Sequence, residues 1–413
     1  MSATLVSLYS GAGGLDLGLE AAGFDVRLCV EFDEDARETL AMRGWRLSNP
    51  GDVHELLNAG TLKEQAGLSA RKVTLLAGGP PCQPWSKSGY WVDGSTKRLD
   101  DPRATTLAAY MKVVEDLLPE VILLENVRGL ALGGKDDAMG LLRRELGRVN
   151  KTHGTRYSAV TLHMNAADFG APQIRERLFV VAHREGRELE EPEATHGGSE
   201  PHRTAWDAIG DLDVDEESPE VRMCGKWARL IASIPEGRNY LWHTPGGGGE
   251  PLFGARTRFW SFLLKLAKAE PAWTIQANPG PATGPFHWNN RRLALKELAR
   301  LQTFPKSFRF SGEYRSVLRQ IGNAVPPILG EVLGLAIRNQ LLGDSVSTRP
   351  TEYIIRHRRE CPGPEPVGAV PAEYLHLRGK HAPHPGEGKG PGATRRATPE
   401  RAQNGRAAAV AVR

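Results

Sequence analysis

Residues 5–32 read LVSLYSGAGGLDLGLEAAGFDVRLCVEF, and this stretch decides the fold class. The apolar run Leu5–Tyr9 predicts a strand, Gly11–Gly14 a tight turn, and Leu15–Ala22 a helix. A second strand is predicted at Val26–Phe32. A strand, a glycine turn and a helix together form a site for a nucleotide-like ligand, because the helix N-terminus offers free amides. The turn lacks the six-residue dinucleotide fingerprint, so an adenosine ligand without phosphates fits better than NAD.

The alternation of strands and helices continues to about residue 183. Such alternation requires crossover connections and predicts an α/β protein with a mostly parallel, Rossmann-like sheet. The last two strands are expected to form a hairpin at one edge. Further strands are predicted at Val73–Ala77, Val121–Leu124, Tyr157–Met164 and Leu178–Ala182, and helices at about residues 34–43, 104–118 and 141–149.

Composition divides the chain into four segments. Periodicity is lost after the predicted sheet, where Gly, Pro and Trp become frequent, and helical patterning returns later. The last stretch is rich in Pro and Gly with few large apolar groups, which is typical of disorder. We therefore predict a sheet domain at 1–184, a smaller loop-rich domain at 185–305, a segment returning to the first domain at 306–344, and a basic, disordered tail at 345–413.

The formal net charge of +4 over 413 residues hides an uneven distribution. Residues 185–221 carry a net charge of −11, residues 222–309 carry +10 and residues 345–413 carry +6. The basic region 222–309 also holds five of the nine tryptophans. Cations interleaved with flat rings suit contacts to phosphates and bases, so this region is expected to bind nucleic acid. A solvated charged face is the simpler alternative.

Several classes of protein are excluded by composition. Four cysteines in so long a chain do not make a disulfide framework. No apolar stretch reaches the roughly 18 residues of a membrane span, and the N-terminus lacks a secretory signal. We therefore expect a soluble, cytoplasmic protein without a membrane partner. We also expect a monomer and no metal site.

One cysteine is distinguished by its setting. Residues 78–86 read GGPPCQPWS and directly follow the strand predicted at 73–77. Cys82 is thereby placed at the carboxyl edge of the sheet, where open α/β folds bind ligands, in a loop that prolines make rigid. An isolated cysteine is most often a small core residue. Rigid presentation at this edge favours a nucleophile instead.

Together the motifs resemble those of the DNA (cytosine-5) methyltransferases. The GGPPCQPWS stretch is similar to the family's nucleophile loop, and the matching elements follow the family's order and spacing from residue 5 to about residue 340. The resemblance implies an S-adenosylmethionine-dependent methyltransferase sheet with a smaller, loop-rich target-recognition domain. The other matching motifs are Tyr9–Gly14, Leu124–Val127, Gln173–Arg177, the stretch from Arg292 to Pro305, and Gln320–Pro326.

The implied cofactor is S-adenosylmethionine, in agreement with a pocket that lacks a phosphate cradle. By resemblance, Tyr9 would lie against the adenine, Glu31 would bind the ribose, and Asp52 with Val53 would read the adenine edge. The family often has an acid where this chain has Ser7. The implied cofactor-binding residues are Tyr9, Gly11, Gly13, Gly14, Glu31, Asp52, Val53, Asn323 and Val325.

The implied reaction is methylation of carbon 5 of cytosine. Addition of the Cys82 thiolate at carbon 6 would make carbon 5 nucleophilic. Glu125 would meet the charge that develops at ring nitrogen 3, and the apolar strand before it predicts a raised pKa for this carboxyl when the base is bound. Arg177 would hold the base oxygen and orient Glu125, with Arg175 beside it. Since carbon 5 is buried in a duplex, the base must be flipped out.

Contacts to DNA are expected from two regions. The loop at 83–102 would act as a lid, and the basic region would read the duplex. Deleting 345–413 is expected to leave catalysis intact, because the resemblance ends before this tail. The candidate DNA-binding residues are Gln83, Ser86, Lys87 and Ser88 in the loop, and Arg256 and Arg258 in the basic region.

The resemblance is to a stand-alone bacterial enzyme of the restriction–modification type, because the sequence starts directly on the first strand. A restriction endonuclease would be its functional partner, without stable contact. An RNA (tRNA) cytosine-5 methyltransferase and an inactive DNA-binding module are the alternatives. A recognition region of over 100 residues favours duplex DNA over RNA. The intact set of Cys82, Glu125 and Arg177 favours an enzyme.

Overall fold

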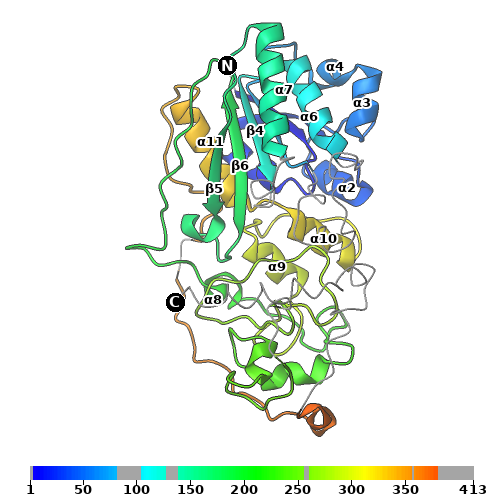
Figure 1. Ribbon diagram of the computed structural model, residues 1–413, viewed down its shortest axis with the longest axis vertical. Helices are drawn as coiled ribbons and strands as arrows, with labels where there is room; N and C mark the ends of the chain where they lie inside the picture. The colour runs from blue at the N-terminus through cyan, green and yellow to red at the C-terminus, as the bar shows by residue number, and fades with distance from the viewer. Residues whose placement is uncertain (1–2, 81–103, 127–137, 255–259, 356–357, 380–413) are drawn as a thin grey trace, which may run out of the picture.

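A computed structural model describes residues 3–80, 104–126, 138–254, 260–355 and 358–379. Its strands are β1 Ala3–Leu8, β2 Phe24–Val30, β3 Leu75–Gly78, β4 Val121–Asn126, β5 Val160–Asn165 and β6 Glu176–His183. They form one six-stranded sheet in the order β2-β1-β3-β4-β6-β5 (Figure 1). β1 to β4 run parallel, and β6 is antiparallel to both of its neighbours. The predicted α/β class and the edge hairpin are confirmed.

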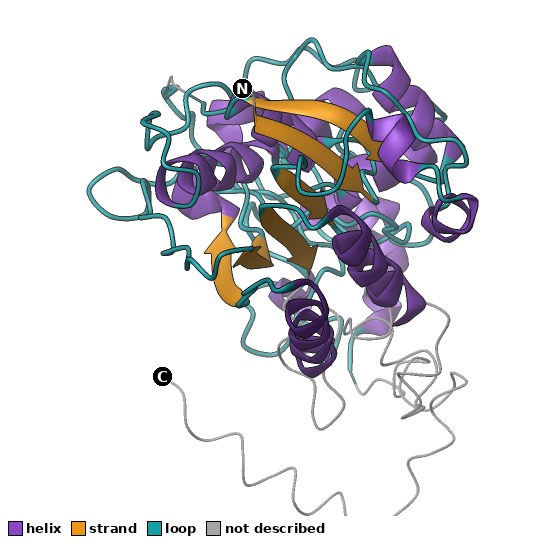
Figure 2. Cartoon of the chain, turned by 90° about the horizontal axis from the view of Figure 1, so that it is seen from above, coloured by secondary structure: helices purple, strands orange, loops and turns teal. Residues whose placement is uncertain are grey.

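Helices cover both faces of this sheet (Figure 2). They are α1 Gly14–Ala21, α2 Glu34–Met42, α3 Val53–Ala59, α4 Leu62–Ala66, α6 Ala104–Leu117, α7 Ala138–His153, α8 Ala205–Ile209, α9 Leu295–Leu301, α10 Tyr314–Asn323 and α11 Pro327–Gln340. Successive residues of β1 point to opposite faces. Leu5 therefore packs with α1 and α11, whereas Val6 and Leu8 pack with α3, α4, α6 and α7. Both faces of the central strands are buried, which explains their continuous apolar runs.

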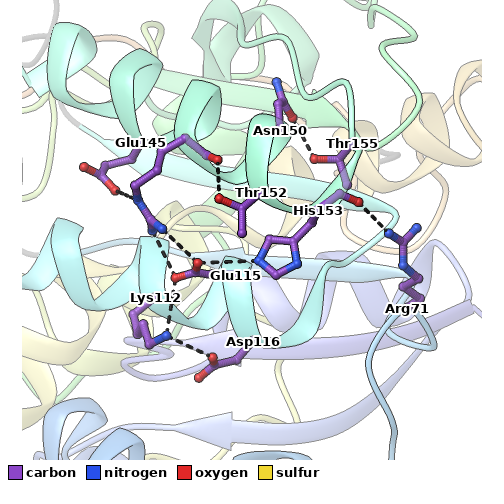
Figure 3. A network of polar contacts seen from close by, with 10 residues as sticks. Arg71, Lys112, Glu115, Asp116, Glu145, Asn150, Thr152, His153 and Thr155 are labelled. Atoms are coloured by element: carbon purple, nitrogen blue, oxygen red, sulfur yellow. Dashed lines mark hydrogen bonds and ion pairs between the residues drawn. The ribbon is translucent and has the colours of Figure 1, made fainter.

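An ion-pair network joins α6 to α7 at the surface (Figure 3). Arg148 donates two hydrogen bonds to the Glu115 carboxylate, at 2.8 and 3.0 Å, and Lys112 lies 3.3 Å from it. The guanidinium of Arg148 is the main reason that the pKa of Glu115 falls to about 2. Because both cations are about half exposed, such pairs add little stability. Their effect is to fix the two helices relative to each other.

The chain between α8 and α9 forms the loop-rich unit expected from its composition. In its described part, 210–254 and 260–294, the regular elements are the short 3-10 helices Ala228–Ser233 and Tyr240–His243 and a few isolated bridges. An aromatic and aliphatic cluster around Leu230, Tyr240 and Phe286 forms its own core. A unit with so few backbone ladders depends on such side-chain packing.

One helical stretch has the length and hydropathy of a membrane span. It runs from Tyr314 to Gln340 and so includes α10 and α11, with an 18-residue window that is 83% buried inside the protein. The backbone is not helical at Ala324–Pro326, between the two helices. This stretch is therefore explained as a pair of core helices.

The prediction of a disordered tail is wrong for residues 345–355 and 358–379, which we call the C-terminal strap. Backbone N–H groups at 351–353 donate to the buried carboxylate of Glu331 on α11. Tyr374 is only 3% exposed. Composition concealed this order because the strap has few large apolar groups, and those few insert into cores formed by other segments. The rest of the predicted tail lies outside the described residues.

α1 and α11 approach each other at a distance that only glycine allows. A Cβ on Gly18 would lie 2.1 Å from the carbonyl oxygen of Pro327. Gly18→Ala is expected to push the helices apart and to lower the free energy of unfolding by about 2–3 kcal/mol, measured by urea denaturation. Gly147→Ala is the control, at an exposed position of α7 with open space around it. The control should raise stability by up to about 1 kcal/mol. Equal effects of the two changes would contradict the close approach.

Candidate active site

The glycine turn after β1 forms the floor of the candidate cofactor site. Tyr9, Gly11 and Gly13 have positive φ angles of 55°, 54° and 76°, a region that glycine adopts freely. The N–H of Gly11 donates to Oε2 of Glu31 at 2.8 Å. Oε1 of Glu31 accepts from the N–H groups of the next two residues, at 3.0 and 2.9 Å. Glu31 thereby ties the end of β2 to the turn. Its burial raises the pKa of this carboxyl, and the three N–H donors oppose that shift.

Gly13 and Gly14 of the turn are required by close contacts. A Cβ on Gly13 would lie 2.4 Å from the ring of Trp45, and a Cβ on Gly14 would lie 2.3 Å from the carbonyl oxygen of Val325. Val325 is 6% exposed and lies directly against the turn, although it is distant in sequence. Asn323, the last residue of α10, is exposed. The structure therefore brings the turn and the element at 320–326 together.

Tyr9 and Asp52 lie on the same side of this site. The hydroxyl of Tyr9 donates to the carbonyl of Thr106 in α6 at 2.8 Å. Oδ1 of Asp52 accepts from two N–H groups in the first turn of α3, as an N-cap does, at 2.8 and 3.1 Å. Burial, and then the charge of Asp52, raises the pKa of Tyr9, so the two groups are close enough to interact. Val53 is 4% exposed and packs into the core below.

Phe32 is a residue of this site that sequence reasoning missed. It directly follows Glu31 at the carboxyl end of β2, and its side chain is 66% exposed. The exposed ring offers a flat apolar surface beside the Glu31 carboxylate. The signal in the sequence was an aromatic residue directly after the expected ribose-binding acid.

Glu125 and Arg177 form an ion pair at the adjacent strand ends. Glu125 lies in β4 and Arg177 in β6, and Nε of Arg177 is 2.9 Å from Oε1 of Glu125. The side chain of Arg177 is 11% exposed and that of Glu125 is 14% exposed. A Cβ on Gly79 would lie 3.0 Å from Oε2 of Glu125. The loop that leads to Cys82 therefore starts against this carboxylate. Burial raises the pKa of Glu125, and the charges of Arg177 and then Arg175 oppose the rise.

Arg175 is fully buried, with its guanidinium on backbone carbonyls. Nη1 donates to Ile275 at 3.1 Å, and Nη2 donates to Gly322 and Ala324 at 2.6 and 2.9 Å. Nearby, the Gln173 amide donates to the carbonyl of Leu301 at 3.2 Å. Of the two arginines predicted beside the base, the structure thus places Arg177 on Glu125 and Arg175 where three segments of the chain meet.

Several predicted site residues lie outside the described part of the chain. They are Cys82, Gln83, Ser86, Lys87, Ser88, Arg256 and Arg258. Within the described ranges, no group of three or more His, Cys, Asp or Glu side chains could hold a metal ion.

A buried polar cluster lies beneath the glycine turn. Asp16, in the first turn of α1, is fully buried, and neither of its carboxylate oxygens has a hydrogen-bond partner among the described residues. Ser10 donates to the hydroxyl of Ser7 at 2.9 Å, and Cys29 is the register partner of Ser7 on β2. Burial is the main reason that the pKa of Asp16 rises to about 7. The charge of Glu20 adds to the shift.

This raised pKa makes stability depend on pH. Asp16 stays protonated in the folded chain up to about pH 7, whereas it ionises near its ordinary value of 3.8 when unfolded. Unfolding between these values releases a proton, so stability falls as the pH rises. Asp16→Asn removes this dependence, and its stability relative to wild type should grow by up to about 4 kcal/mol between pH 4 and pH 8. Urea denaturation of the cofactor-free protein measures it. Glu34→Gln, exposed in the first turn of α2, is the control. A difference that stays constant with pH would contradict the raised pKa.

Comparison with known proteins agrees with this arrangement. A family model described as C-5 cytosine-specific DNA methylase matches residues 3–339. Type II methyltransferase M.SacI of Streptomyces achromogenes is 38% identical over 371 residues, which cover 82% of this chain and 93% of that protein. Type II methyltransferase M.NgoFVII of Neisseria gonorrhoeae is 30% identical over 333 residues, covering 78% of this chain and 83% of that protein.

Solved structures show the same fold at lower identity. A prophage-encoded protein of E. coli described as a DNA modification methyltransferase has a TM-score of 0.60 at 24% identity, over 83% of this chain and all of that one. DNMT2 of Spodoptera frugiperda has a TM-score of 0.56 at 16% identity, over 81% of this chain and all of that one. With the glycine turn, the Glu125–Arg177 pair and the match over residues 3–339 together, the chain belongs to the C-5 cytosine-specific DNA methylase family.

Proposed function

We propose that this enzyme methylates carbon 5 of a flipped-out cytosine within a specific duplex DNA sequence, through a covalent adduct with Cys82. The main observation is the ion pair between Glu125 and Arg177, whose Oε1 and Nε atoms are 2.9 Å apart. Gly79, at the start of the loop that leads to Cys82, lies against the Glu125 carboxylate. A nucleophile loop, an acid of raised pKa and a paired cation at one sheet edge are the groups that this chemistry requires.

The residues around the glycine turn fit S-adenosylmethionine. Glu31 holds its carboxylate against the turn, and the exposed ring of Phe32 next to it offers a flat apolar surface. We assign the adenine to Phe32 and Tyr9 and the ribose to Glu31. When bound, S-adenosylmethionine supplies the electrophilic methyl group that carbon 5 accepts.

The chain's own residues prepare the base. Addition of the Cys82 thiolate to carbon 6 breaks the aromatic ring system, and the electron pair moves towards carbon 5 and ring nitrogen 3. Burial raises the pKa of Glu125 and so favours the protonated form, which can donate a proton to nitrogen 3. Arg177 orients Glu125 through its Nε and can bind the base oxygen. Loss of the carbon 5 proton and departure of the thiolate then restore the aromatic ring.

Arg175 acts on this chemistry indirectly. Its guanidinium is occupied by carbonyls of Ile275, Gly322 and Ala324, so we assign it a positioning role rather than contact with the base. Arg175 and Arg177 are two residues apart on an extended chain, about 6–7 Å along a strand. The contacts that fix the backbone at Arg175 therefore also fix the point from which the Arg177 side chain starts.

The relatives named as Type II methyltransferases favour a role in restriction–modification. We propose that the enzyme works in the cytoplasm, where methylation would protect host DNA from a paired endonuclease. The two enzymes would be linked by their function and not by stable contact, since both would recognise the same DNA sequence.

Covalent trapping tests the proposed reaction. On duplexes that contain 5-fluorocytosine, the carbon 5 position carries fluorine, which cannot leave as a proton does, so the enzyme should stay attached to the DNA. Wild type is expected to form this adduct only with S-adenosylmethionine, and Cys82→Ser should form none. Glu125→Gln should slow trapping by about 100-fold or more, because the proton for nitrogen 3 is lost.

The matched control for that experiment is Glu120→Gln. Glu120 immediately precedes β4, at the end of the strand opposite to Glu125, and its side chain is 38% exposed. It should trap at the wild-type rate. Methyl transfer to tRNA but not to duplex DNA would favour the RNA alternative, and no adduct on any nucleic acid would reject the proposed reaction.

Phe32→Ala tests the assigned adenine site. Loss of the exposed ring should weaken S-adenosylmethionine binding by about tenfold, because aromatic contacts to a base contribute about 1–3 kcal/mol. Isothermal titration calorimetry without DNA measures it. Met42→Ala serves as the control, since Met42 is also apolar and 51% exposed but ends α2. If both variants bind the cofactor as wild type does, the ring of Phe32 has no part in the site.

A further inference from the structure

We propose that the C-terminal strap is part of the DNA-recognition unit, and that Tyr374 is a positioning residue that holds the basic segment 222–238 in place for target-sequence discrimination. This inference rests on the proposed function. It goes beyond the family resemblance, because the family model ends at residue 339 and the strap begins at residue 345.

The strap is anchored on the sheet domain. The carboxylate of Glu331 on α11 is 2% exposed and accepts the N–H groups of Thr351, Glu352 and Tyr353, at 2.7, 3.0 and 3.2 Å. A carboxylate that binds three successive N–H groups fixes the backbone strongly. Ile354 packs with the apolar cluster of α1 and α11. The beginning of the strap is thus fixed to the catalytic body.

The strap then contacts the loop-rich unit through buried or paired charges. The backbone N–H of Arg359 donates to Asp207 at 2.9 Å, and its guanidinium lies 3.0 Å from Asp211. Further along, Nζ of Lys268 is 2.6 Å from Glu365 and 3.0 Å from Glu236. Lys268 is 3% exposed, so Glu365 supplies part of the charge that its burial requires.

The strap ends by inserting a ring into the core of the recognition unit. Tyr374 is 3% exposed and belongs to the cluster of Leu230, Tyr240 and Phe286. Its ring stacks on Trp227, with centroids 5.8 Å apart and planes 20° apart. Other strap residues, Val370 and Leu377, pack against the same cluster. The core of this unit is therefore incomplete without the strap.

The same ring fixes the backbone that carries exposed cations. The hydroxyl of Tyr374 donates to the carbonyl of Lys226 at 2.8 Å, and Nζ of Lys226 lies 4.7 Å from the centroid of the Trp227 ring. Glu373 pairs with Arg229 at 2.9 Å. Because the regular structure of this part of the chain is limited to short 3-10 helices, the positions of these cations depend on the contacts that the strap makes here. Loss of the ring would let the basic segment shift.

The test compares full-length variants in DNA and cofactor binding. The target duplex is identified by bisulfite sequencing of DNA from cells that express the enzyme. Tyr374→Ala should weaken binding to this duplex by about tenfold or more and bring it towards the affinity for an unrelated duplex. Affinity for S-adenosylmethionine should be unchanged, because its site lies on the sheet domain. Tyr374→Phe keeps the stack on Trp227 but removes the hydrogen bond to Lys226, so it should lose less discrimination than Tyr374→Ala does.

Val367→Ala is the matched control, because Val367 is also apolar and in the strap but 48% exposed. It should behave as wild type. If Tyr374→Ala also loses cofactor binding, Tyr374→Leu decides, since it keeps apolar volume but not the stack. Wild-type discrimination in both Tyr374→Ala and Tyr374→Leu would overturn the inference. Failure of the wild type itself to methylate any DNA would instead reject the proposed function.

Discussion

The buried guanidinium of Arg175 is the contact on which the rest of the structure depends. A fully buried cation is costly unless its N–H groups find acceptors. Here the acceptors are carbonyls of Ile275 in the loop-rich unit and of Gly322 and Ala324 in the element before α11. Separation of any of these segments would leave a charge in an apolar interior without partners. The sheet, the loop-rich unit and the closing element are therefore held as one body.

The geometry of the candidate active site depends on this contact of Arg175. Arg175 precedes β6, and Arg177 follows two residues later on the same extended chain, so its side chain starts from a fixed point. Arg177 then holds Glu125, and Glu125 meets the start of the Cys82 loop at Gly79. The element that Arg175 holds also carries Val325 onto the glycine turn. One buried cation thus connects the Glu125–Arg177 pair to the element that lies on the glycine turn.

Sequence reasoning succeeded where a local rule or an ordered motif set existed. The glycine turn and the strand alternation could be predicted because each follows from backbone physics within a short window. The contacts of Arg175 could not, because the carbonyls it binds come together only in the tertiary structure. Phe32 was missed because exposure of a ring is not visible in sequence.

The strap was mispredicted for a related reason. Composition measures whether a segment can build a core by itself, and this segment cannot. Tyr374 instead completes a core whose other buried members lie between Leu230 and Phe286. Helix α10 was likewise not predicted, although its buried face packs with α9 and with the recognition unit.

The structure shows ion pairs between the acidic stretch and the basic region of the chain. The acidic stretch 185–221 supplies counter-charges to the neighbouring basic region: Glu216 lies 3.4 Å from Arg291, and Asp211 lies 3.3 Å from Arg300. Cations that already have carboxylate partners release few counterions when a phosphate approaches. The net charge of +10 at 222–309 therefore overstates the attraction of this region for DNA. The exposed cations Arg222 and Lys226 precede Trp227 in the chain, and the strap stacks Tyr374 on the Trp227 ring.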